Sequence, residues 1–231
     1  DIEVSPGAKD LQGGRASFGL KAGEDLFAAG STHEGEEEIL LDVFRRLSGD
    51  FPNLRLLIAP RHVNRAAQID KLIQDAGFIS VRYSSLNEIH LSTNSGLVPS
   101  GAEGRTTNNE QRITILDTIG HLNEAYSVAE LVFIGGSLVK HGGHNPVEPA
   151  YFCRPIIFGP HMFNFKYIAN AFLKDKAAVM VFNKEDLYEK CKLLLNNNDI
   201  RNTLGLAAKK VVVENKGAAE RNTAELSRIL K

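Results

Sequence analysis

The chain is poor in several residue types and patterns that define common protein classes. Its 231 residues include no tryptophan and only two cysteines, Cys153 and Cys191, which do not form a CxxC pair. A disulfide framework and thiolate-bound zinc are therefore not indicated, and a reducing compartment is the natural environment. No apolar run approaches the ~20 residues that cross a bilayer. Lys and Arg number 27 against 28 Asp and Glu, so the basic footprint of a nucleic-acid-binding protein is missing.

The common nucleotide-binding and catalytic signatures are also missing. GxGxxG does not occur, and the glycines at 14 and 19 are followed by Leu-Lys-Ala rather than by the Lys-Ser/Thr of a Walker A motif. His141 and His144 lack a nearby third ligand, which makes them weak evidence for a metal site. Asp117 has no Ser or His partner at the spacing of a catalytic triad. An anion site, if present, must come from local geometry.

Short runs of apolar residues predict an α/β fold. Several runs, such as LRLLIA and LVFIG, are apolar throughout, which is typical of strands covered on both faces in a parallel sheet. Helical spacing separates them, and this alternation predicts a Rossmann-like, doubly wound, mostly parallel sheet. Strands are expected at 26–29, 54–59, 79–83, 113–116, 131–134, 155–158 and 178–182. Helices are expected around 39–47 and 69–76, after Gly120, after Pro146, near 167–173, and from Lys184 onward with breaks at 196–199 and near Gly217.

Two segments do not fit this alternation. Residues 1–25 are rich in glycine and polar residues and begin without Met, which suggests an interdomain linker or domain start within a longer protein. The domain itself is then expected to span 26–231. Residues 92–111 have almost no apolar content, and we expect a mobile loop there.

Polar segments follow two expected strands directly. Ser31 and Glu34 have capping-box spacing, so a helix is expected to begin there with free amides that can accept an anion. The same residues can equally serve only to cap the helix, and Glu36–Glu38 are interpreted as a solvated helix face. After the next strand, Arg61 can hold a phosphate or carboxylate by a bidentate contact.

The strongest signal is a pair of double-glycine loops. Gly135-Gly136-Ser137 ends an apolar strand, and Gly142-Gly143-His144-Asn145-Pro146 leads into a helix. Glycines beside a helix start are how many folds cradle phosphates, so these loops predict an anion site. Glu148, on the first turn of that helix, can accept two adjacent sugar hydroxyls, although it can also simply compensate the helix dipole.

Taken together, these motifs resemble one family. They are GSTHEGEE (30–37), PRH (60–62), DT.G.L (117–122), FIGGS (133–137), GGHNP.EPA (142–150) and GP...NF (159–165). In this order they resemble the carboxyl-terminal half of the 3-deoxy-D-manno-octulosonic acid (Kdo) transferases, from about Leu26 to the end. The resemblance implies one half of a two-domain GT-B glycosyltransferase that binds the donor CMP-Kdo. The other half, outside this chain, is implied to hold the catalytic base, the lipid acceptor surface and the membrane contact.

The resemblance also implies a set of donor-binding residues, none of them catalytic. It assigns the CMP phosphate to residues 135–137 and the helix start near Asn145, aided by Arg61, and the ribose hydroxyls to Glu148. Ser31 and Thr32 are implied to border the phosphate or the Kdo, and His62 to contribute as a neighbour. The full set is Ser31, Thr32, Arg61, His62, Gly135, Gly136, Ser137, Gly143, Asn145 and Glu148. Cytosine contacts are guessed only at Ile119 and Gly120.

The implied reaction transfers Kdo to a lipid A precursor in lipopolysaccharide biosynthesis, with inversion, without a metal and without a cofactor. The implied location is the cytoplasmic face of the bacterial inner membrane, and the chain alone is expected to bind CMP but transfer nothing. Two alternatives stay open. One is a GT-B transferase or sugar epimerase that uses another nucleotide sugar. The other is a non-catalytic Rossmann-like interaction domain.

Overall fold

The computed structural model describes residues 14–86 and 112–229, with side chains up to Asn215. Residues 1–13, which hold half of the expected linker, and the expected loop 92–111 lie outside the described residues. Seven strands form one parallel sheet in the order β3-β4-β2-β1-β5-β6-β7, which confirms the predicted fold class. The strands are β1 (Asp25–Thr32), β2 (Leu54–Pro60), β3 (Ile79–Arg82), β4 (Arg112–Ile115), β5 (Leu131–Ile134), β6 (Ile156–Phe158) and β7 (Val179–Met180).

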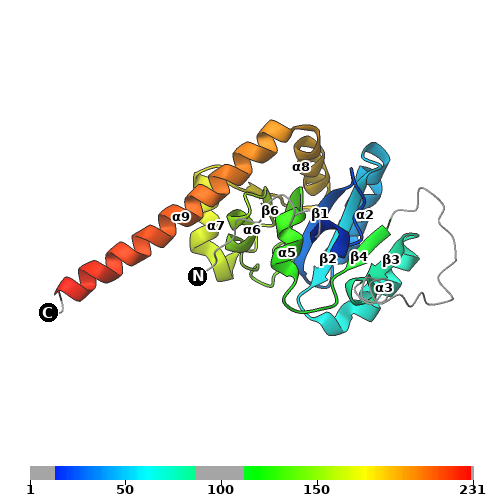
Figure 1. The fold of residues 1–231 in the computed structure, drawn as a ribbon, viewed down its shortest axis with the longest axis horizontal. Helices are drawn as coiled ribbons and strands as arrows, with labels where there is room; N and C mark the ends of the chain where they lie inside the picture. The colour runs from blue at the N-terminus through cyan, green and yellow to red at the C-terminus, as the bar shows by residue number, and fades with distance from the viewer. Residues whose placement is uncertain (1–13, 87–111, 230–231) are drawn as a thin grey trace, which may run out of the picture.

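The helices follow the predicted alternation, with two corrections. They are α2 (Glu36–Asp50), α3 (Ala66–Asp75), α5 (Leu122–Val128), α6 (Val147–Tyr151), α7 (Lys166–Lys174), α8 (Lys184–Asn196) and α9 (Asn198–Ile229), with single turns η1 (Val63–Arg65) and η2 (Phe163–Phe165). The break predicted near Gly217 is wrong, because one glycine costs a helix only about 1 kcal/mol and α9 continues through it (Figure 1). The capping box predicted at Ser31 is also wrong: α2 begins at Glu36, after Gly35 at φ 92°.

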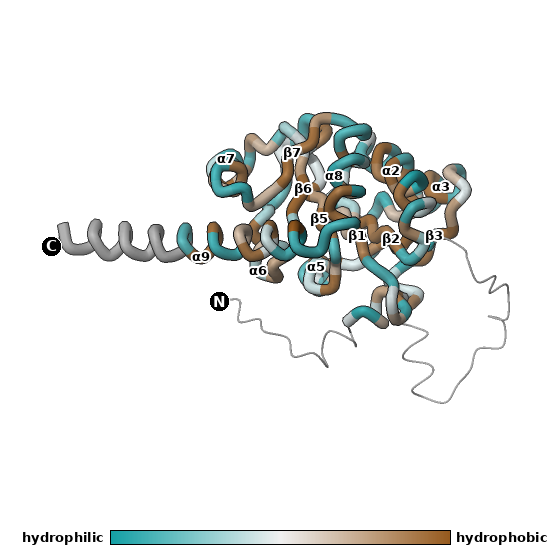
Figure 2. The backbone as a smooth tube through the Cα atoms, turned by 90° about the horizontal axis from the view of Figure 1, so that it is seen from above, coloured by the Kyte–Doolittle hydropathy of each residue, from teal (hydrophilic) through white to brown (hydrophobic). Residues whose placement is uncertain are grey.

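Alternate strand residues divide the core into two layers. In β1, Phe27 and Ala29 face a cluster formed with α2, α3 and α8, whereas Leu26 and Ala28 face a cluster formed with α5, α6, α7 and the start of α9. Figure 2 shows α2, α3 and α8 on one side of the sheet and α5 and α6 on the other. Both faces of the central strands are therefore covered, as the apolar runs predict. Within the described residues, no helix combines the length and the apolar content needed to cross a membrane.

The residues just before β1 pack onto this core. Phe18 is 1% exposed, and its ring centroid lies 5.0 Å from that of Tyr83. Arg15 donates hydrogen bonds to the carbonyls of Val128 and Glu24. Residues 14–24 thus belong to the packed body, and the boundary between a linker and the domain stays a prediction.

The strand order creates a switch point between β1 and β5. From β1 the chain proceeds to β2, β3 and β4 on one side, and then returns to form β5 on the other side of β1 (Figure 1). The helices that follow β1 and β5, α2 and α6, cover opposite faces of the sheet, and open α/β sheets bind ligands at such points. The segments that carry most of the motifs end up here.

Candidate functional site

The end of β1 is pulled away from regular strand geometry. Ser31 adopts φ 56°, and the register between β1 and β2 shifts between Gly30 and Thr32. The amide of Arg61 donates to the Thr32 carbonyl at 3.0 Å, which ties the ends of β1 and β2 together. A left-handed serine in a bulge is an unusual backbone state, typical of functional sites.

The two double-glycine loops lie against each other. The amide of Gly143 donates to the carbonyl of Gly136 at 2.8 Å, although the loops are separated in sequence by five residues. Gly135 donates to the carbonyl of Gly30 at 2.8 Å, and a Cβ on Gly135 would overlap the carbonyl of Ser31. Glycine at 135 is thus required by the close approach of two backbones rather than by a ligand.

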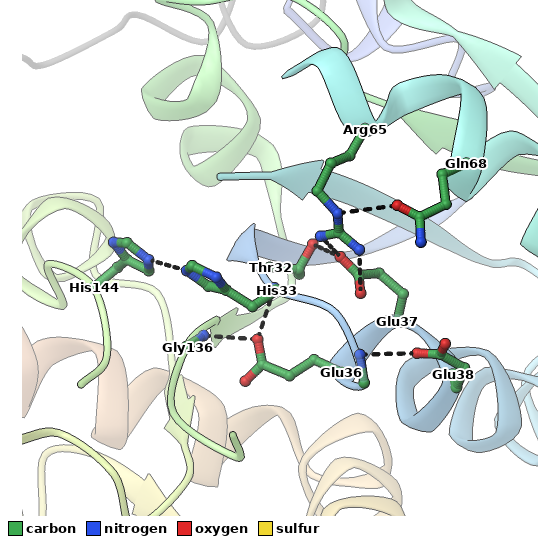
Figure 3. Close-up of polar contacts among 10 residues, drawn as sticks. Thr32, His33, Glu36, Glu37, Glu38, Arg65, Gln68, Gly136 and His144 are labelled. Carbon is green, nitrogen blue, oxygen red and sulfur yellow. Dashed lines mark hydrogen bonds and ion pairs between the residues drawn. The ribbon is translucent and has the colours of Figure 1, made fainter. Parts of the chain in front are cut away.

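The amides expected to cradle a phosphate already hold a carboxylate. We call the backbone N–H groups of Gly136, Ser137 and Leu138 the amide nest. They donate to the two oxygens of Glu36 at 2.7, 3.0 and 3.0 Å, and the His33 amide donates to the same carboxylate at 3.0 Å. Figure 3 shows the contacts from Gly136 and His33. This corrects the phosphate cradle predicted from Gly135–Ser137, because an anion supplied by α2 fills it.

The prediction that Glu36 lies on a solvated helix face is wrong. Glu36 is 0% exposed, as is Glu37, so the two carboxylates are part of the interior and not of a solvated helix face. Burial raises the pKa of Glu36, while the four amide hydrogen bonds act in the opposite direction.

Two predicted donor-binding hydroxyls are buried and already used. Thr32 is 0% exposed, and its hydroxyl donates to Glu37 at 2.8 Å. Ser137 is 0% exposed; its hydroxyl donates to the Ile134 carbonyl and accepts from the Gly159 amide at 2.7 Å. The structure therefore does not bring either hydroxyl to a ligand surface, because each one satisfies buried partners of its own.

Two arginines near the end of β2 have different surroundings. Arg65 makes a two-pronged contact with the buried Glu37, with Nη1 to Oε1 at 2.8 Å and Nη2 to Oε2 at 3.3 Å (Figure 3). Arg61 is exposed, and within residues 14–86 and 112–215 no carboxylate lies within ion-pair distance of it. His62, also exposed, follows directly. Among the residues with described side chains, Arg61 thus has no carboxylate that neutralises its charge.

Four histidines gather beside the amide nest, and we call His33, His62, His141 and His144 the histidine cluster. They come from the loops that follow β1, β2 and β5. The Nε2 atoms of His33 and His144 are 2.8 Å apart (Figure 3), and the ring of His141 stacks on His33 with centroids 4.1 Å apart. His62 meets His33 edge-on at 6.4 Å. Within the described residues, no three His, Cys, Asp or Glu side chains are arranged so that they could hold a metal ion.

The cluster lowers the basicity of its central members. The pKa of His33 falls to about 4 because burial disfavours its charged form, with further lowering by His141, His144, His62 and Arg65. The pKa of His144 also falls to about 4, through burial first and then through Arg61, His141 and His62. Both rings are therefore neutral at pH 7.

The remaining predicted residues lie at the start of α6. The N-cap of this five-residue helix is Pro146, and the side-chain oxygen of the preceding Asn145 accepts from the Val147 amide at 3.1 Å. Its amide nitrogen donates to Oε1 of Glu148 at 3.1 Å. Glu148 is half-buried, which leaves it accessible to a further donor. Gly143 packs against Met162, and Gly120 and Ile119 form an exposed turn after β4.

Sequence reasoning missed His33, His144 and Glu36 as a connected group. A signal existed for Glu36 and Glu37, since each stands four residues before a buried leucine, Leu40 or Leu41, on the same face of α2. His33 and His144 carried no comparable signal, because the contact between them joins residues 111 apart in sequence.

Comparison with known proteins gives a consistent relationship. No family model matches the chain. It is 36% identical over 202 residues to the 3-deoxy-D-manno-octulosonic acid transferase of Haemophilus influenzae, a match that covers 87% of this chain and 43% of that protein. The 3-deoxy-D-manno-octulosonic acid transferase of Aquifex aeolicus is 29% identical over 77% of this chain and 44% of its own length. The chain thus spans less than half the length of these curated relatives.

A solved structure shows the same fold. The C-terminal CMP-Kdo binding domain of WaaA from Acinetobacter baumannii aligns with a TM-score of 0.73 at 23% identity, over 88% of this chain and 96% of that one. The agreement in fold extends over nearly the whole of that domain. The chain thus has the same Rossmann-like α/β fold as that domain.

Proposed function

Because this chain belongs by sequence to the 3-deoxy-D-manno-octulosonic acid transferase family, we propose that it forms the donor-binding half of such an enzyme. The whole enzyme transfers Kdo from CMP-Kdo to a lipid A precursor in lipopolysaccharide biosynthesis. The relative from H. influenzae supports the reaction class, and the CMP-Kdo binding domain of A. baumannii, which has the same fold, supports the donor.

The exposed guanidinium of Arg61 at the switch point is the observation that carries this proposal. A nucleotide sugar brings a phosphate to the carboxyl edge of the sheet, and Arg61 meets it with a charge that no described carboxylate neutralises. His62 lies beside it. The amide nest is not part of this phosphate site, because Glu36 fills it.

Glu148 is the proposed partner of the ribose hydroxyls. One of its oxygens accepts from Asn145 at 3.1 Å, and this contact fixes the carboxylate at the edge of the sheet. A fixed carboxylate can accept hydrogen bonds from two neighbouring hydroxyls. Ser31 is half-buried at the bulge that ends β1, at the same edge of the sheet, and is proposed to lie next to the bound donor.

In this proposal the donor half stabilises the leaving group. When the bond between Kdo and CMP breaks, negative charge grows on the phosphate, and a guanidinium at this position stabilises that charge. Arg61 supplies the positive charge, so transfer proceeds without a metal. The base that deprotonates the acceptor belongs to the other half of the enzyme, attack occurs with inversion, and that half contacts the lipid acceptor at the cytoplasmic face of the inner membrane.

Calorimetric titration with CMP and with cytidine tests the donor site. Arg61→Ala should weaken CMP about ten- to hundredfold and leave cytidine nearly unchanged, because a hydrogen bond to a charged group contributes about 1.5–3 kcal/mol. Arg45→Ala, an exposed arginine on α2, is the matched control and should change neither affinity. Equal losses for CMP and cytidine would remove Arg61 from the phosphate site.

The identity of the nucleotide and the need for the other half are tested separately. CMP should bind more tightly than UMP or UDP; preference for a uridine nucleotide would favour a transferase or epimerase of another specificity. If no nucleotide binds, the chain is a non-catalytic domain. CMP-Kdo mixed with a lipid A precursor should give no product with this chain alone, because the base is missing; measurable turnover would contradict the assignment of the base.

A further inference from the structure

The His33–His144 contact restricts how many protons the histidine cluster can hold. Two Nε2 atoms 2.8 Å apart share one hydrogen, so one ring donates and the other accepts. A second proton on the accepting nitrogen would set two N–H groups against each other. The stacked ring of His141, at 4.1 Å from His33, adds the repulsion of a third imidazole whenever more than one ring is charged.

The groups around the pair are unusually one-sided in charge. Arg61 and His62 approach from the end of β2, His141 from the loop after β5, and Arg65 from η1. The carboxylates nearby are already engaged, since Glu36 accepts four backbone amides and Glu37 accepts from Arg65 and Thr32. Within the described residues, the cluster therefore has cationic neighbours and no carboxylate of its own to stabilise added protons.

An anion placed against these rings reverses that balance. Its negative charge favours the protonated form of each nearby imidazole, and its oxygens accept from N–H groups that would otherwise face each other. The bound anion therefore stabilises the protonated forms of His33 and His144, which are disfavoured in the free protein. Binding and protonation are consequently linked.

We propose that the histidine cluster receives the phosphate of the nucleotide next to Arg61 and takes up a proton from solvent as it does so. This inference rests on the proposed function, which supplies the nucleotide. It assigns the phosphate contact to His33 and His144, two residues that are not in the set of donor-binding residues implied by the family resemblance. No covalent bond changes; one solvent proton moves to an imidazole nitrogen.

Calorimetry of the 231-residue chain at pH 7, in buffers of different ionisation enthalpy, measures this proton directly. The main ligand is the methyl phosphodiester of CMP, because its single acid group does not titrate near neutral pH, whereas CMP has a phosphate pKa near 6. We expect net proton uptake with the diester, none with cytidine, and an affinity for the diester that rises about three- to tenfold from pH 8 to pH 6.

Variants separate the cluster from other titrating groups. His33→Gln and His144→Gln should each remove most of the uptake, with a melting temperature that shows the variant is folded. His121→Gln is the control, since His121 lies at the start of α5 beside Tyr83 and Glu124, and uptake should remain.

The outcomes distinguish this inference from the proposal on which it rests. If the diester binds without proton uptake, or if uptake survives in both glutamine variants, the inference is wrong and the donor site stands. If neither CMP nor the diester binds to the folded chain, the proposed function fails and this inference fails with it.

Discussion

The amide nest and the histidine cluster lie side by side at the switch point, yet the protein treats them differently. Each could attract an anion: the nest has three converging N–H groups, and the cluster has four imidazoles beside Arg61. The nest is filled by Glu36, which is 0% exposed. The cluster has no acidic side chain among the described residues as its partner, and several of its rings reach the surface.

At this edge of the sheet, the amide nest therefore has a structural role, whereas the histidine cluster is the candidate for binding. A carboxylate built into the chain fixes the loop after β5 against α2, and burying that carboxylate is tolerated because four amides replace its water. The histidine cluster, in contrast, has no acidic partner among the described residues, and burial lowers the pKa of His33 and of His144 to about 4. A group of hydrogen-bond donors or cations therefore does not by itself indicate a ligand site. The better indication is such a group without an acidic partner among the described residues.

The largest expected effect comes from emptying the nest. Glu36→Ala should lower the free energy of unfolding by about 3 kcal/mol, because four buried amides lose their acceptor, partly offset by removal of a buried charge. Urea denaturation measures this free energy. The value for Glu36→Gln, which keeps one acceptor oxygen, should lie between those of the wild type and Glu36→Ala.

The matched control for the nest is Glu38→Ala. Glu38 is exposed and, among the described residues, accepts only the Gly35 amide, at 3.1 Å, so its loss should cost about 0.5 kcal/mol. Added formate should restore part of the stability of Glu36→Ala by entering the vacated space. A cost below about 1 kcal/mol for Glu36→Ala would mean that the nest is not a structural anion site.

An intermediate effect is expected from acid. The pKa values of His33 and His144 lie near 4 in the folded protein and near 6.5 when unfolded. Between these values the unfolded chain binds more protons, so stability falls as pH decreases from 6.5 to 4. Because both rings are partly exposed and screened by solvent, we expect a loss of roughly 1–2 kcal/mol for the pair.

Urea denaturation at several pH values checks this sign. The double variant His33→Gln/His144→Gln should lose less stability than the wild type across this window. Parallel pH profiles of the two proteins would show that the cluster does not titrate in this way.

The smallest expected effect is that of salt. Because Arg61 and His62 are exposed, the affinity for CMP should fall about two- to fourfold between 50 and 200 mM NaCl, whereas that for cytidine should not change. The contacts of Glu36 are buried and should not respond. If the affinity for CMP does not depend on salt, the open charges do not contact the phosphate.

Much of the fold follows from the sequence, whereas the pairing of its charges does not. The apolar runs at 54–59 and 131–134 identify strands directly, since strands covered on both faces need continuous apolar residues. The double glycines predicted an anion cradle, and the anion that the structure places there is a side chain of the protein itself. The ligand of the resulting nest is Glu36, which lies 100 residues from Gly136, and local spacing contains no information about such a contact.

The histidine cluster shows the same limit. His33, His62 and His141 each follow a different strand, and they meet only because β1 lies between β2 and β5 in the sheet. The sequence predicts the strands without predicting that order. The burial of Glu37 was easier to predict from the sequence, because the helical repeat places Glu37 on the same inner face of α2 as Leu41.

The two-pronged grip of Arg65 on Glu37 has a consequence for how the neighbouring arginines can be exchanged. A lysine carries the same unit charge but concentrates it on one nitrogen, so it cannot reproduce two parallel contacts to a carboxylate. At position 65, a lysine would therefore lose one of the two hydrogen bonds to the buried carboxylate of Glu37. At 61 no described residue holds the guanidinium, so a lysine there should leave the folded protein intact and lose only the second contact to a bound phosphate.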